Sequence, residues 1–216
     1  MTSDETLRQI VLTELEWTPS VNATHIGVAV RHGVVELTGH VESYAEKLTA
    51  EQCAQKIAGV KGVAQEINVR LPNHAMRADD EIADRVARVL SWDAMVPPET
   101  IKVTVEKGWV TLRGEVAWNY QRDVASHAVQ KLSAVVGVTN LLTVKERVSP
   151  TNVKAKIEDA FRRDALLDAA KINVRAQGGE VVLEGHIKSW HERDLASQAA
   201  WSAPGVSHVV DRLRIA

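Results

Sequence analysis

The sequence predicts an α+β protein of three tandem α-β-β-α-β units, each a small three-stranded mixed sheet with two helices on one face. Two observations lead to this fold class. A glycine-ended segment recurs three times, so that Gly114 lies 75 residues after Gly39 and Gly185 lies 71 residues after Gly114. The same offsets align the apolar positions of the chain without a gap, which is the mark of an internal repeat.

Each unit begins with a predicted helix, because apolar residues recur four positions apart. In the first unit this helix covers about residues 5–16, with Leu7, Val11 and Leu15 on one face. The same pattern predicts helices over about 80–91 and 151–162. The third has a proline near its start, a position that a helix tolerates.

Two alternating strands follow in every unit and end at the recurring glycine. A two-residue turn with glycine second separates them: His32-Gly33, Lys107-Gly108 or Gly178-Gly179. Glycine readily adopts the positive φ that a tight hairpin turn needs, so the pattern indicates a β-hairpin.

A second helix and a last strand complete each unit. In the first unit the inward positions of this helix are Ala50, Cys53, Ala54 and Ile57. Small residues at this spacing let a helix lie close to a sheet, which favours both helices on one face. Proline-containing linkers then separate the units, and we predict domains at 1–71, 77–146 and 149–216.

The composition excludes several classes of protein. The chain has 216 residues, of which 45% are apolar and 25% charged, with a net charge of −2, as in an ordinary folded protein. No long apolar run predicts a transmembrane segment, and the near-neutral charge argues against a nucleic-acid partner. The first residues lack the basic and apolar regions of a signal peptide, so we expect a cytoplasmic protein.

The repeated motifs resemble those of the BON domain family. They are the segment before Gly39, Gly114 and Gly185, an aromatic residue after it, an alanine-rich helix, and Gly-Val-x-x-Val at 59–63 and 205–209. The resemblance covers nearly the whole chain as three copies. The resemblance implies a non-enzymatic module. Members of the family are associated with envelope phospholipid, with stress survival and, in some cases, with ligand sensing.

The residues themselves predict no catalytic, cofactor or metal site. Cys53 aligns with Ala128 and Ala199, so we interpret it as a small buried residue. The histidines do not share aligned positions, apart from His40 and His186, and no pair has metal-ligand spacing. Nucleophile and phosphate-loop motifs are missing from the sequence.

Exposed surfaces are the better candidates for function. Val34 and Trp109 are expected on the open face of their sheets, and Trp201 on the wet side of a second helix, for partner contact or for packing between units. Net charge rises from −3 in residues 1–72 to 0 in 73–147 and +1 in 148–216. In the last unit, the candidate residues for contact with a partner or with lipid are four basic side chains of the first helix: Lys154, Lys156, Arg162 and Arg163. Trp17 and Trp92 are expected to be partly buried.

These features, together with what the family resemblance implies, predict a stress-associated binding module rather than an enzyme. Its partner would be an anionic phospholipid surface or another protein. Two alternatives stay open: a scaffold that self-associates into a homo-oligomer through Val34, Trp109 and Trp201, and a sensor of a small ligand or ion.

Overall fold

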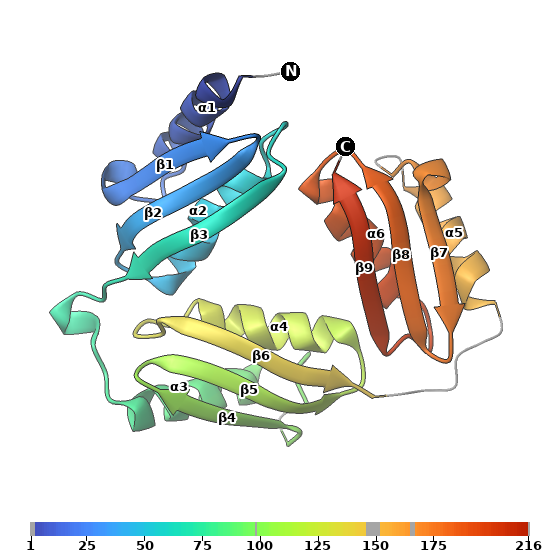
Figure 1. The fold of residues 1–216 in the computed structure, drawn as a ribbon. Coiled ribbons are helices and arrows are strands. Elements are labelled where there is room, and N and C mark those ends of the chain that lie inside the picture. Colours follow the sequence, from blue (N-terminus) through green and yellow to red (C-terminus); the bar gives the residue numbers. More distant parts are fainter. Residues whose placement is uncertain (1–2, 98, 146–151, 165–166, 216) are drawn as a thin grey trace. The chain divides into compact units, whose positions relative to one another are not determined.

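The computed structural model describes residues 3–97, 99–145, 152–164 and 167–215. Its strands form three separate three-stranded sheets, ordered β1-β2-β3, β4-β5-β6 and β7-β8-β9 (Figure 1). The predicted α+β class and its three α-β-β-α-β repeats are therefore confirmed.

The first repeat shows the plan of all three. Helix α1 is followed by a β1–β2 hairpin, and β3 then pairs with β2 in parallel after the second helix. The elements are α1 (Asp4–Trp17), β1 (Ile26–Arg31), β2 (Val34–Val41), α2 (Tyr44–Gln55) and β3 (Gly62–Val69).

The second and third repeats follow the same order. The second consists of α3 (Asp79–Trp92), β4 (Ile101–Glu106), β5 (Trp109–Val116), α4 (Asn119–Gln130) and β6 (Gly137–Val144). The third consists of α5 (Val153–Arg163), β7 (Ile172–Gln177), β8 (Glu180–Ile187), α6 (Trp190–Trp201) and β9 (His208–Ile215). The helix start predicted at residue 151 lies outside the described residues.

Spatial proximity divides the chain differently from the repeats. It gives two compact units. One consists of Met1–Gly114 and Gln121–Leu142, and the other consists of Glu115–Tyr120 and Thr143–Ala216. That division crosses the second repeat, whereas each sheet stays within one repeat. The domain boundaries 1–71, 77–146 and 149–216 stay predictions.

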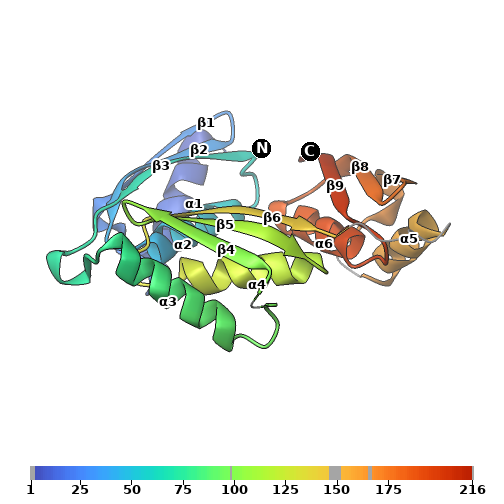
Figure 2. The same cartoon turned by 90° about the horizontal axis from the view of Figure 1, so that it is seen from below.

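The core of each repeat lies between its two helices and one face of its sheet. Figure 2 shows α3 and α4 on the same side of the β4-β5-β6 sheet. In the first repeat, Leu7, Val11 and Leu15 of α1 are buried with Val35 and Leu37 of β2. These are the positions that the sequence periodicities assign to the core, since helices bury every third or fourth residue and strands every second.

An aspartate at the start of the first helix clamps the hairpin turn in two repeats. The carboxylate of Asp4 accepts hydrogen bonds from the backbone N–H groups of His32 at 2.7 Å and Gly33 at 3.0 Å. Asp79 does the same for Lys107 and Gly108, at 2.7 and 2.8 Å. The clamp ties the helix start to a turn whose residues have positive φ.

We expect the Asp4 clamp to make stability depend on pH. The hydrogen bonds from His32 and then Gly33 lower the pKa of Asp4 below its usual value. A lowered pKa in the folded state means that the carboxylate stabilises the fold above its unfolded-state pKa of about 3.9. This contribution is lost as the pH falls through the folded-state pKa.

Urea unfolding of the protein and of Asp4→Asn at a series of pH values measures this effect. The two free energies of unfolding should differ at neutral pH and converge in acid, once the carboxyl group is protonated. A difference that stays constant over this range would contradict the clamp.

Candidate functional site

The described part of the chain holds no cluster of three or more His, Cys, Asp or Glu side chains that could bind a metal ion. Cys53 is buried, as predicted, and its Sγ lies 3.3 Å from the hydroxyl of Thr18. No helix among the described residues has the length and apolar character needed to cross a bilayer. The candidate sites are therefore on the surface of each repeat.

Val34 and Trp109 occupy equivalent positions at the start of β2 and β5. They are 44% and 48% exposed, on the sheet face that the helices leave open. Val34 lies beside Gly62 of β3, and the Trp109 ring lies beside Gly137 of β6. The third repeat has Glu180 at this position, opposite His208.

Trp201 is less available than the sequence predicts. It is only partly exposed, and it packs against the core of the third repeat. It stands at the C-terminal end of α6, where a large ring can fold back onto its own domain. Partner contact and packing between units both stay open as predictions for Trp201.

The four basic residues of α5 fall into two pairs. Lys154 and Arg162 are already neutralised by ion pairs with Glu158, at 3.6 Å, and Asp159, at 2.6 Å. Lys156 and Arg163 are exposed, and within the described ranges neither takes part in an ion pair. They are seven residues apart, so they lie on one side of the helix.

Trp17 and Trp92 are the residues for which the sequence prediction was wrong. They are 82% and 89% exposed, rather than partly buried. Each follows a buried leucine, Leu15 or Leu90, by two residues. Two residues turn a helix by about 200°, so the tryptophan points away from the core. A helical projection of the sequence would have found both.

These tryptophans belong to a surface that recurs on the first helix of every repeat. We call it the outer stripe. It consists of three positions separated by three and four residues, which share one exposed side of a helix. The positions are Ile10, Thr13 and Trp17 on α1; Arg85, Arg88 and Trp92 on α3; and Lys156, Asp159 and Arg163 on α5.

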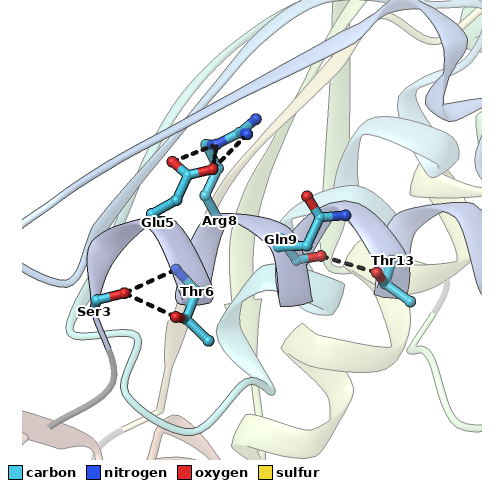
Figure 3. A network of polar contacts seen from close by, with 6 residues as sticks. All are labelled: Ser3, Glu5, Thr6, Arg8, Gln9 and Thr13. Carbon is cyan, nitrogen blue, oxygen red and sulfur yellow. Dashed lines mark hydrogen bonds and ion pairs between the residues drawn. The ribbon is translucent and has the colours of Figure 1, made fainter.

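The outer stripe of α1 is the most apolar of the three. Ile10 is 43% exposed, and the hydroxyl of Thr13 donates to the carbonyl oxygen of Gln9 at 2.9 Å, which satisfies it within the helix (Figure 3). The polar groups near the helix start are also engaged with one another, as Figure 3 shows for Glu5 and Arg8. This stripe therefore presents mainly apolar surface.

The outer stripe of α3 combines an aromatic ring with two cations. Arg85 donates to the hydroxyl of Ser133 at 3.5 Å, and Arg88 forms an exposed ion pair with Asp84. Met95, just beyond the helix, is 58% exposed. We call Arg85, Arg88, Trp92 and Met95 the α3 patch.

The fold and these surfaces define a class of protein: tandem small α+β domains whose distinctive groups are exposed apolar and basic side chains. The family model described as "BON domain" matches residues 3–70, 78–146 and 149–216. The chain belongs to the BON domain family.

The chain is also similar to one curated protein in sequence and, weakly, to two solved structures. The chain is 29% identical over 130 residues to "Osmotically-inducible protein Y" of Escherichia coli (strain K12), a match that spans 58% of this chain and 65% of that protein. Two structures of CdsD, a structural protein of the type III secretion system of Chlamydia trachomatis, have TM-scores of 0.28 and 0.27. They are 15% and 16% identical, and the matches cover 96% and 97% of this chain and 91% and 97% of theirs. Such scores carry no inference about this chain.

Proposed function

We propose that the chain is a non-enzymatic binding module that associates with anionic phospholipid membranes through the α3 patch. The observation that carries this proposal is Trp92, a large aromatic side chain that is 89% exposed. Water contacts nearly all of its apolar surface in the free protein. Burial of such a ring at a membrane interface is favourable, because tryptophan places its apolar body toward the lipid and its N–H toward water.

The two arginines of the α3 patch give the surface a preference for anionic lipid. A basic residue close to an anionic membrane contributes about 1 kcal/mol. Arg88 is shared with Asp84, but exposed ion pairs are weak, so a phosphate can replace the carboxylate at small cost. Lys156 and Arg163 on the outer stripe of α5 are further basic groups that anionic lipid would attract. The ion pairs of Lys154 and Arg162 are exposed like that of Arg88, so phosphate can replace their carboxylates in the same way.

A link to osmotic stress is part of the proposal. It rests on the similarity to a relative whose name describes osmotic induction. A module that binds membranes reversibly suits a response to changing conditions, since one exposed ring and a few charges give modest affinity.

Co-sedimentation with vesicles of phosphatidylcholine alone and of phosphatidylcholine with phosphatidylglycerol tests the proposal. We expect binding only when the anionic lipid is present. Trp92→Ala should weaken it by about tenfold, because the exposed ring supplies most of the apolar contact. Arg85→Glu should weaken it by a similar factor through reversed charge.

Trp17→Ala is the matched control. Trp17 is as exposed as Trp92, but Glu14 and Glu16 precede it, and anionic lipid would repel them. Its loss should change binding by less than the loss of Trp92. No binding to anionic vesicles, or binding that Trp92→Ala leaves intact, would overturn the proposal.

Self-association is the competing proposal. Val34 and Trp109 are exposed apolar residues on open sheet faces, which are surfaces that a second copy could cover. Light scattering over a range of concentrations separates the two ideas. A protein that stays monomeric at high concentration is not a self-associating scaffold.

A further inference from the structure

A groove of about 470 Å³ lies on the open face of the β4–β5 hairpin in the second repeat. Its wall includes the side of β5 opposite to the buried Val110 and Leu112. The lining groups that matter here are Thr104, Glu106, Lys107, Trp109, Thr111 and Arg113. They comprise one aromatic ring, two cations, one carboxylate and two hydroxyls.

The Trp109 ring is held in place at one end of this groove. Its Nε1 donates to the hydroxyl of Thr139 at 2.8 Å. The ring lies against Gly137, where a Cβ atom would come within 2.4 Å of it. Glycine is thus required for the ring to reach this position. One hydrogen bond and one close backbone contact fix the ring, which still remains 48% exposed.

This arrangement occurs in the second repeat and not in the others. The first repeat has Val34, Gly62 and Ala64 at the equivalent positions, and the third has Glu180, His208 and Val210. Neither set has an indole ring, and neither has a hydroxyl that could fix one. Structural needs of the fold therefore do not explain Trp109 and Thr139, because the same sheet forms without them.

The charge of the groove favours an anionic ligand. Lys107 and Arg113 make no ion pair within the described residues, and Glu106 is the single acidic group among the lining residues. Trp109 and Arg113 lie on the same side of β5, four residues apart, which corresponds to about 13 Å along a strand. A ligand with a planar ring stacked on Trp109 and a phosphate near Arg113 would contact both ends of the groove.

We propose that this groove binds a mononucleotide. The base stacks on the free face of Trp109, the phosphate accepts charge-assisted hydrogen bonds from Arg113, and the hydroxyls of Thr104 and Thr111 lie between them for the ribose. Aromatic stacking and guanidinium–phosphate contacts are the usual means of recognising these two parts of a nucleotide. A neutral sugar would use the ring but leave both cations without a partner.

Isothermal titration calorimetry with AMP, adenosine and ribose 5-phosphate tests this assignment. AMP should bind more tightly than either fragment. Trp109→Val should weaken AMP and adenosine by about tenfold and leave ribose 5-phosphate unchanged. Arg113→Gln should weaken AMP and ribose 5-phosphate by about tenfold and leave adenosine unchanged. Valine is the replacement of choice, because Val34 stands beside Gly62 at the same place in the first repeat.

Trp92→Ala is the matched control, since it removes an exposed tryptophan of the same repeat that lies outside the groove. It should leave the affinity for AMP unchanged while it weakens vesicle binding, so the two proposals fail independently. Absence of AMP binding at millimolar concentration, equal AMP binding by Trp109→Val, or tighter binding of maltose than of AMP would each overturn the nucleotide assignment.

Discussion

Gly114→Ala is expected to destabilise the second repeat by about 3 kcal/mol or more. A Cβ atom on Gly114 would lie 1.9 Å from the carbonyl oxygen of Thr100, far inside van der Waals contact. Its φ of +141° is also a conformation that residues with a side chain rarely adopt. The obstacle is backbone next to a strand, so it cannot rotate away as a side chain could.

The same geometry recurs at Gly39 and Gly185. A Cβ atom there would lie 2.0 Å from the carbonyl oxygens of His25 and Lys171. The glycine that ends the repeated motif is therefore required by the close approach of the residue that immediately precedes the first strand of its hairpin. We expect substitutions at all three positions to have effects of the same size.

Gly178→Ala is the control for the effect of Gly114→Ala. Gly178 also has a positive φ, of +57°, but a Cβ atom on it would meet nothing within 4 Å. The cost should be only that of the left-handed backbone, about 1 kcal/mol. Urea unfolding followed by circular dichroism compares the two. If Gly114→Ala lowers the free energy of unfolding by no more than Gly178→Ala does, the close contact with Thr100 does not explain why all three repeats have glycine at this position.

Glu192→Ala should destabilise the third repeat by about 2 to 3 kcal/mol. Glu192 is the buried charged residue of the described core, at 4% exposure. Its two carboxylate oxygens accept hydrogen bonds from the backbone N–H groups of Asp168, at 3.2 Å, and Lys188, at 2.6 Å. Removing the carboxylate leaves both donors without a partner, which costs more than the bonds themselves contribute.

The conservative variant Glu192→Gln separates the contribution of the carboxylate's hydrogen bonds to stability from that of the side chain's size. Glutamine keeps one carbonyl oxygen, so it can satisfy one of the two donors and should cost less than alanine. The second repeat already has Gln121 at the equivalent position, while the first has Glu46, which bonds Asn22 and Glu42 in the same way. Thermal and urea unfolding of both variants measure the difference. Equal losses for glutamine and alanine would contradict this role.

Much of the fold could be predicted from the sequence because the relevant signals are local and occur three times. The predicted core positions Leu7, Val11 and Leu15 are buried, and Ala50 and Cys53 line the inner side of α2 as expected. A periodicity reports which side of an element meets the core. Agreement among three copies then removes the ambiguity that a single copy would leave.

The candidate surfaces were less predictable. Trp17 and Trp92 were expected to be partly buried, because they come one turn past the core positions of the first helix, yet they are the most exposed large apolar side chains in the described residues. Trp201, which the sequence places on the wet side of its helix, is partly exposed and also packs on the core of its own repeat. A residue type predicts average burial, whereas the direction of one side chain depends on its turn of the helix and on its neighbours.

The sequence by itself determined the number of repeats, the order of their elements, and the glycines at their hairpins, because these follow from spacing along the chain. Only the tertiary structure decided which exposed groups act together. The Trp109 ring is fixed by Thr139 and Gly137, about thirty residues away on another strand, and two of the four α5 cations are neutralised by neighbours. Such pairings depend on distances across the fold, which no pattern along the chain contains.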